Sequence, residues 1–159
     1  RLTLHYYPGE ENTLYNGIIY DDDGFTQDAW KSKNAEIIRL KANEGKTTLL
    51  SISSDNGTFI GKPLIREITW IIHNITKKPE KITLNGTPIE IINQDNPIDY
   101  SSLSNKLTEI EYFKNSKSIK PTKGKGTATK QQAVWDPNGN KLYILSTFNG
   151  KPQTLKIKK

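Results

Sequence analysis

Residues 15–30 read YNGIIYDDDGFTQDAW, and this stretch decides the fold. Residues 14–20 are half apolar, which favours a β-strand. Aspartate hydrogen-bonds its own backbone in turns and glycine takes a positive φ at no steric cost, so the acidic run that ends at Gly24 predicts a turn. We expect a second strand to resume at Phe25, which makes the stretch one β-hairpin.

Other short strands are predicted at close spacing, with no sustained helical period between them. The strongest covers residues 64–73, where both faces carry apolar side chains and Trp70 lies between isoleucines, which predicts a central place in a sheet. Asn85-Gly86 is a favoured two-residue hairpin turn. The fold class that we expect is therefore all-β, an antiparallel β-sandwich of short strands and hairpins with little helix. The remaining strand candidates are residues 2–7, 36–42, 47–53, 82–84, 89–92, 132–135, 141–148 and 153–157.

The pattern divides the chain into three parts. Residues 1–92 are expected to form the core of the sandwich. Residues 93–130 are rich in Asn, Ser, Lys, Thr and Pro and are expected to be a polar, lysine-rich loop or insertion. Residues 131–159 are expected to form a terminal three-stranded β-meander that completes the same sandwich.

Length and composition limit the classes of protein to which this chain can belong. The chain has 159 residues, which is enough for one domain with a real core, but only 33% of them are apolar and the mean hydropathy is −0.68. It has no cysteine, so disulfides and thiolate chemistry are excluded. No stretch approaches the roughly 18 apolar residues of a membrane span. The chain starts at Arg1 without a signal peptide, so we expect a fragment of a longer protein, and a periplasmic or secreted parent stays open.

The net charge of +6 comes from one segment. Six lysines and no acidic residue lie between Tyr112 and Trp135, and without them the basic and acidic residues are equal in number. The segment lacks the interleaved aromatic side chains that single-strand nucleic-acid binders use for stacking. It therefore favours a solvated loop, and we expect no nucleic-acid partner.

Asp21, Asp22 and Asp23 are the candidate acidic site. Consecutive residues at a strand end point to different sides, so they cannot flank a scissile bond as paired acid and base. They also lack the alternating spacing and distant glutamate of a calcium-binding helix-loop-helix. A solvated structural turn is the favoured reading. Calcium binding through carboxylates and carbonyls is the alternative, and no other cofactor is expected.

Among the histidines and aromatic residues, few are candidates for a functional site. His5 and His73 are the only histidines, and each falls in a predicted strand without a ligand pattern, so neither metal binding nor catalysis is expected of them. Trp70 is predicted to be in the core. Trp30, beside a charged turn, is the candidate for an exposed platform on which a sugar ring stacks.

An ordered set of motifs resembles a known family. It consists of LTLHYYPG at residues 2–9, IYDDDG at residues 19–24, Arg66, and then IHN at 72–74 followed by KPEKITLNG at 78–86. In this order the motifs resemble the C-terminal β-sandwich region of family-31 glycoside hydrolases, the α-glucosidase and α-xylosidase group. The resemblance covers about the first 90 residues.

Two positions depart from the family pattern. Asp22 stands where glutamate is common, and Trp30-Lys-Ser-Lys33 lacks the glycine of the family's aromatic turn.

The resemblance implies a role without catalysis. In this family a separate (β/α)₈ barrel supplies both catalytic aspartates, so no catalytic residue can be assigned to this chain, and the barrel and neighbouring domains of the parent chain are its expected partners. The implied function is structural support for a parent enzyme that cleaves α-glycosidic bonds. The alternative is a carbohydrate-binding module that uses exposed aromatic residues, and a third class is a polyanion-binding or adhesion domain that uses the lysine segment.

Overall fold

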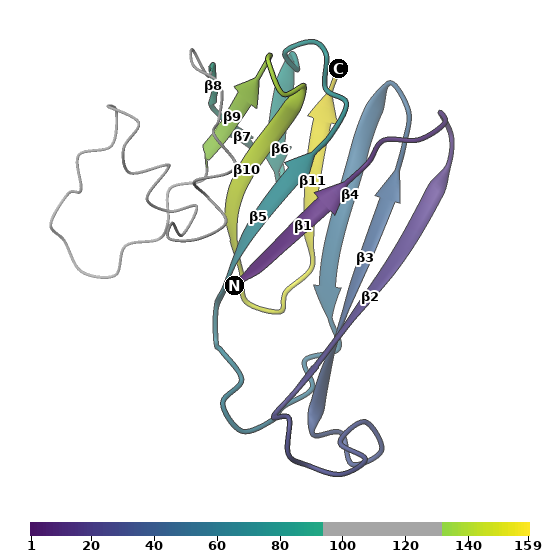
Figure 1. Ribbon diagram of the computed structural model, residues 1–159, viewed down its shortest axis with the longest axis vertical. Helices are drawn as coiled ribbons and strands as arrows, with labels where there is room; N and C mark the ends of the chain where they lie inside the picture. Colours follow the sequence, from purple (N-terminus) through teal and green to yellow (C-terminus); the bar gives the residue numbers. More distant parts are fainter. Residues whose placement is uncertain (94–131) are drawn as a thin grey trace, which may run out of the picture.

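The computed structural model describes residues 1–93 and 132–159, which form eleven strands and no helix. These residues contain no helix long and apolar enough to span a membrane. The strands lie in two facing sheets, so the predicted all-β sandwich is confirmed (Figure 1). The strands are β1 (Leu2–Tyr6), β2 (Leu14–Asp22), β3 (Ala35–Asn43), β4 (Thr47–Ser54), β5 (Arg66–Ile72), β6 (Lys81–Leu84), β7 (Thr87–Ile89), β8 (Ile91–Asn93), β9 (Gln132–Asp136), β10 (Lys141–Phe148) and β11 (Gln153–Lys158).

One sheet has the strand order β1-β5-β10-β9-β8 and the other has the order β2-β3-β4-β11-β6-β7. Two pairs are parallel, β1 with β5 and β8 with β9, and the other described pairs are antiparallel. A parallel pair needs a long connection between its strands. The β1–β5 pair satisfies this because β2, β3 and β4 lie between them in the sequence.

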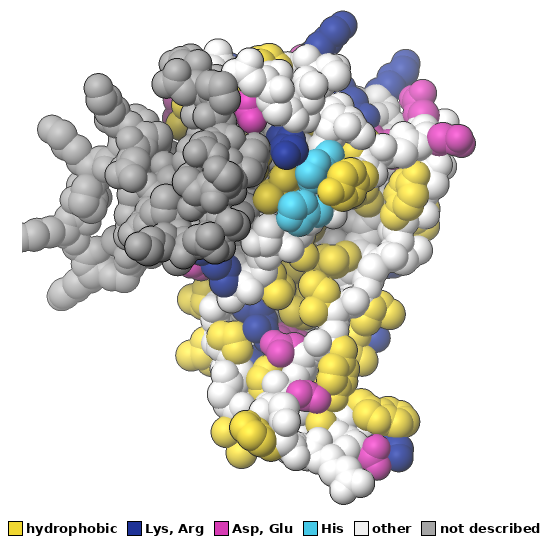
Figure 2. Space-filling model, in the orientation of Figure 1, with side chains coloured by type: hydrophobic (Ala, Val, Ile, Leu, Met, Phe, Trp, Pro, Cys, Tyr) yellow, Lys and Arg dark blue, Asp and Glu magenta, His cyan; other side chains and the backbone are white. Residues whose placement is uncertain are grey.

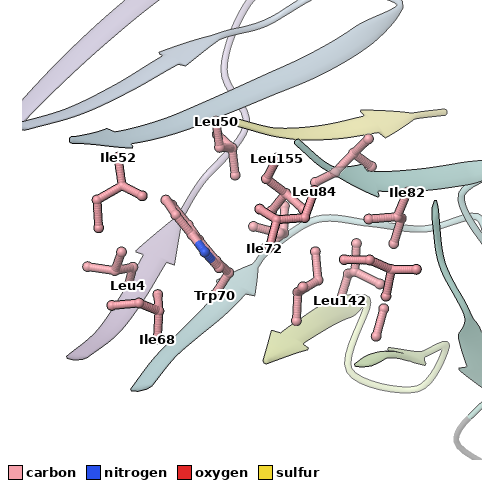
Figure 3. Close-up of a cluster of buried hydrophobic side chains, with 14 of the residues drawn as sticks. Leu4, Leu50, Ile52, Ile68, Trp70, Ile72, Ile82, Leu84, Leu142 and Leu155 are labelled. Carbon is pink, nitrogen blue, oxygen red and sulfur yellow. The ribbon is translucent and has the colours of Figure 1, made fainter. Parts of the chain in front are cut away.

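The core lies between the sheets and consists largely of isoleucine and leucine (Figure 3). Strand β5 lies between β1 and β10, as its two apolar faces predicted, and its Trp70 is buried in the core. The outward face of the same sheet carries a second, smaller apolar cluster. Its members are Ile71, Val134, Tyr143 and Leu145.

The predicted opening hairpin is wrong in its second half. No strand resumes at Phe25, and β2 pairs instead with β3, residue for residue from Leu14 opposite Asn43 to Asp22 opposite Ala35. The intervening residues 23–34 form a loop of turns. The reason is local, because the Asp23 carboxylate accepts the backbone N–H groups at the position where a strand would need them for its ladder.

The Asn85-Gly86 hairpin is confirmed. Both residues have positive φ, 50° and 83°, which is the geometry of the favoured two-residue turn. Pro88 is tolerated because β7 is an edge strand. The single strand predicted over residues 89–92 is instead divided at Glu90, where the chain leaves one sheet and enters the other.

The predicted terminal meander is also wrong in its topology. Strands β9 and β10 form a hairpin, but β11 leaves that sheet and inserts between β4 and β6 in the other. The crossing lets Phe148 enter the core from one sheet and Leu155 from the opposite sheet, so both sheets gain apolar contacts. The predicted polar insertion, residues 93–130, lies outside the described residues except for Asn93, which ends β8.

Candidate functional site

The predicted site residues gather at one end of the sandwich, where two loops lie close together (Figure 1). Residues 23–34 connect β2 to β3, and residues 55–65 connect β4 to β5. We call this the loop end. Trp30 belongs to the first loop, and the acidic run of residues 21–23 leads into it.

A buried ion cluster closes the core at the loop end. Glu36 is only 1% exposed and Arg66 only 6% exposed. The Arg66 Nη2 atom lies 2.5 Å from Glu36 Oε2 and 2.7 Å from Asp21 Oδ2. Lys62 Nζ lies 3.1 Å from Glu36 Oε1, and the Ser54 hydroxyl donates to the same oxygen at 2.5 Å. Two cations and two carboxylates therefore join β2, β3, β5 and the second loop.

The protonation of Glu36 follows from this arrangement. Burial by itself raises the pKa of a carboxyl group. The hydrogen bonds from Ser54, Arg66 and Lys62 outweigh burial, so the pKa of Glu36 is lowered. Glu36 is therefore ionised at neutral pH and holds no proton that it could donate as a general acid.

Asp23 organises the first loop. Its Oδ1 atom accepts the backbone N–H groups of Phe25 at 3.0 Å and Thr26 at 2.8 Å, and its Oδ2 atom accepts the Thr26 hydroxyl at 2.6 Å. The bond from the Thr26 side chain and the backbone bonds lower the pKa of Asp23. The carboxylate thus acts as a backbone cap, which is the structural turn that the sequence favoured.

Asp22 is engaged in a different direction. Its Oδ1 atom accepts the N–H of Gly24 at 2.8 Å, and its Oδ2 atom accepts the Tyr20 hydroxyl at 2.7 Å. That hydrogen bond, together with the nearby carboxylates, raises the pKa of Tyr20 to about 12.

The three aspartates therefore have three separate sets of partners. Among residues 1–93 and 132–159, no group of three or more His, Cys, Asp or Glu side chains is placed to hold a metal ion. Calcium binding by Asp21, Asp22 and Asp23 stays a prediction from the sequence.

Exposed apolar side chains gather on both loops. Phe25 is 96% exposed and Leu64 is 91% exposed, although both are large apolar residues. Figure 2 shows apolar side chains over this lower part of the molecule. The apolar loop surface consists of Phe25, Trp30, Ile60, Leu64 and Ile65. Such a group of exposed apolar residues is typical of a surface that contacts another protein or domain.

Trp30 also borders an open groove of about 460 Å³. Tyr20, Asp55 and Asn56 contribute to its walls. Trp30 is 64% exposed, and the centroid of its ring lies 5.1 Å from Lys31 Nζ. An exposed indole beside polar side chains has the chemistry that a sugar-binding groove needs.

The sequence missed one contact that the fold creates. His5 Nδ1 and His73 Nε2 lie 3.0 Å apart, although the residues are separated by 68 positions. The parallel pairing of β1 with β5 brings them together. No local signal predicts this pairing, because the partner strand is distant in the sequence.

Two of the family-like motifs contact each other in the folded chain. Asp21 belongs to the IYDDDG motif, and it contacts Arg66, which the resemblance also includes. Two residues that are 45 positions apart in the sequence thus belong to one ion cluster.

Comparisons with known proteins bear on the fold. No family model and no curated protein matches the sequence. Two structures of a GH31 dextranase from Flavobacterium johnsoniae, one with isomaltotriose and one with glucose, match with a TM-score of 0.70 at 16% and 17% identity. The chain has the fold of a GH31 hydrolase domain. The match covers 99% of this chain but only 16% of the dextranase.

A weaker match is to the cycloalternan-forming enzyme from Listeria monocytogenes, with a TM-score of 0.44 at 10% identity, covering 90% of this chain and 9% of that one. The GH31 dextranase thus supplies the fold comparison, and the chain corresponds to a small part of that enzyme.

Proposed function

We propose that this chain is a non-catalytic C-terminal β-sandwich domain of a larger glycoside hydrolase acting on α-glycosidic bonds, and that it supports the catalytic barrel. One observation carries the proposal: nearly all of this chain matches one-sixth of a GH31 dextranase. A piece of that size leaves most of such an enzyme, including room for a barrel, outside the matched part.

The carboxylates at the loop end support the non-catalytic role. Glycoside hydrolysis requires one carboxyl group to act as an acid and a second to act as a nucleophile or base. Asp21 and Glu36 share Arg66, and the pKa of Glu36 is lowered rather than raised. Asp22 and Asp23 accept hydrogen bonds from their own turn. All four carboxylates therefore have ion-pair or hydrogen-bond partners within the domain, and their role is structural.

The apolar loop surface supports packing against a neighbouring domain. Exposed Phe25 and Leu64 side chains lie on two loops that the ion cluster anchors to the sandwich. An exposed apolar surface is stabilised when a second domain covers it, because water is excluded from both surfaces.

The first test is the mass of the native gene product in its source cells, detected with an antibody against this domain. A species far heavier than 18.0 kDa is expected. A native species near 18.0 kDa would contradict the proposal.

The second test uses the full-length parent protein. Leu64→Asp is expected to shorten the half-life of hydrolase activity on heating, because it places a charge in the domain contact. Leu14→Asp is the matched control, since Leu14 is also exposed but lies at the opposite end of β2. Equal inactivation rates for both variants and the wild type would overturn the packing role.

A carbohydrate-binding module is the second candidate, favoured by Trp30 in the wall of the groove. The dextranase was solved with isomaltotriose, so this sugar is the first probe. If the groove binds sugar, isomaltotriose will change the tryptophan fluorescence of the wild-type chain and leave that of Trp30→Ala unchanged. Identical responses in the two proteins, or no response, would exclude the groove as a site for this sugar.

A further inference from the structure

Strand β2 forms a long, open edge of the six-stranded sheet (Figure 1). It has nine residues, and among the described strands β3 is its only neighbour in the sheet. Because an antiparallel strand turns alternate N–H and C=O groups away from its partner, about half of the backbone groups of β2 point away from β3. Such an edge can accept another strand.

The other outermost strands of the two sheets are less suited to pairing. Strands β7 and β8 have three residues each, and β7 contains Pro88, which cannot donate a backbone hydrogen bond to a neighbour. Strand β1 has five residues. Natural edge strands are commonly protected by short length, by proline or by lysine. Strand β2 has none of these protections, since its sequence LYNGIIYDD is long and contains neither proline nor a basic residue.

The middle of β2 carries exposed apolar side chains on its outward face. Ile18 and Tyr20 share that face, because side chains alternate along a strand. Ile18 is 71% exposed and Tyr20 is 46% exposed. The opposite face of β2 is used within the domain, where Ile19 packs against the core and Asp21 contacts Arg66. The outward row is therefore the face of β2 that is available to a partner.

A second copy of the same strand fits this edge. Two copies related by a two-fold axis pair antiparallel, and an axis through Ile18 places this residue opposite its own copy. The same register places Asn16 of each copy opposite Tyr20 of the other and keeps both outward rows on one side of the joined sheet. The carboxylates of β2 lie at one end of the strand, so the antiparallel register puts them opposite uncharged residues at the other end. Like charges therefore do not face each other across the pair.

We propose that the chain forms a two-fold dimer in which the β2 strands of two copies pair antiparallel about Ile18 and join their six-stranded sheets into one. Backbone hydrogen bonds supply the attraction, and the two Ile18 side chains exclude water at the centre. Because only one strand of each copy takes part, the contact is small and we expect a dissociation constant of about 10–100 µM. The dimer does not involve the apolar loop surface, so it is independent of the proposed function.

Analytical ultracentrifugation of the 159-residue chain tests the dimer. The wild-type chain is expected to change from monomer to dimer as its concentration rises through about 10–100 µM. Ile18→Lys places two like charges opposite each other at the axis, so it is expected to stay monomeric. Ile60→Lys is the matched control, since Ile60 is 87% exposed but lies on the apolar loop surface, and it is expected to dimerise like the wild type. A monomeric wild type, a dimeric Ile18→Lys or a monomeric Ile60→Lys would overturn the proposal.

A disulfide crosslink tests the register. The chain has no cysteine, so Ile18→Cys introduces a single thiol. Opposite residues of an antiparallel pair have Cα atoms about 4.5–5.5 Å apart, which a disulfide can span. Oxidation of Ile18→Cys with diamide is therefore expected to give a covalent dimer in high yield, under conditions in which Ile60→Cys stays mostly monomeric. Equal yields from the two variants would overturn the proposal.

Discussion

The two ends of the sandwich each bury a glutamate, and they do so in different ways. At the loop end, Glu36 is paired with the buried guanidinium of Arg66. At the opposite end, Glu44 lies in the turn between β3 and β4 and accepts the hydroxyls of Tyr6 and Thr48, each at 2.6 Å. Lys159 also forms an ion pair with Glu44, and its side chain is partly exposed.

The comparison teaches how a buried charge can be compensated. Hydroxyl groups satisfy Glu44 without adding a second buried charge, whereas Glu36 requires a buried cation of its own. A buried cation that loses its partner is costly, because its desolvation is no longer compensated. The loop end should therefore be the more fragile of the two when one member of its cluster is removed.

Arg66→Ala is the substitution with the largest expected effect. It leaves Glu36 buried without its main partner and also releases Asp21, so we expect the free energy of unfolding to fall by about 3–5 kcal/mol. Urea denaturation measures the change. A second variant, Arg66→Met combined with Glu36→Gln, should recover part of the loss, and no recovery would argue against unpaired charge as the cause.

Glu44→Ala should cost less. The Tyr6 and Thr48 hydroxyls lose their acceptor, which is expected to lower the free energy of unfolding by about 1–3 kcal/mol. The same denaturation experiment compares the two ends directly. A loss larger than that of Arg66→Ala would reverse the comparison.

Acidification tests both ends together. The pKa values of Glu36 and Glu44 are lowered in the folded protein because hydrogen bonds to each carboxylate outweigh burial. Their stabilisation is therefore complete above the ordinary pKa of 4.5 and is lost as the pH falls through the folded values. We expect Glu36→Gln and Glu44→Gln each to flatten the fall in stability between pH 5 and pH 3, and an unchanged slope in both would contradict the lowered pKa values.

Lys159→Ala tests the exposed ion pair with Glu44, which we expect to contribute less than the buried pair at the loop end. Because the Lys159 side chain is 43% exposed, its ion pair with Glu44 is screened by water and should contribute about 1 kcal/mol or less. High salt should reduce the difference between this variant and the wild type. A larger, salt-insensitive effect would mean that Lys159 is as important to its end as Arg66 is to the other.

Leu64→Asp in the isolated chain should have the smallest effect. Leu64 contacts little in this domain, so the free energy of unfolding is expected to change by no more than about 0.5 kcal/mol. This result separates the apolar loop surface from the core of the domain. A large loss would show that Leu64 stabilises the domain itself.

Much of the fold could be read from local patterns. The apolar side chains on both faces around Trp70 predicted a buried central strand, and Asn85-Gly86 predicted its hairpin, because both signals depend on neighbouring residues. The turn at Asp23 was also predicted, since its hydrogen bonds reach only two and three residues along the chain.

The two errors have different causes. The strand expected at Phe25 is missing because the Asp23 carboxylate accepts the backbone N–H groups of Phe25 and Thr26, so β2 pairs with β3 across a longer loop. The terminal meander assumed that β11 pairs with β10, but β11 joins the other sheet. Pairing between distant segments is decided by which arrangement buries both apolar faces, and a local pattern carries no record of that choice.

By itself, the sequence determined an all-β sandwich, a domain that resembles part of a family-31 glycoside hydrolase, and the turns and central strand that local chemistry specifies. Only the tertiary structure decided that Asp21, Glu36 and Arg66 form one cluster and that His5 meets His73. The physical reason is that periodicity and turn preferences act over a few residues. These contacts form between strands that the sequence keeps far apart, and burial of the shared core brings them together.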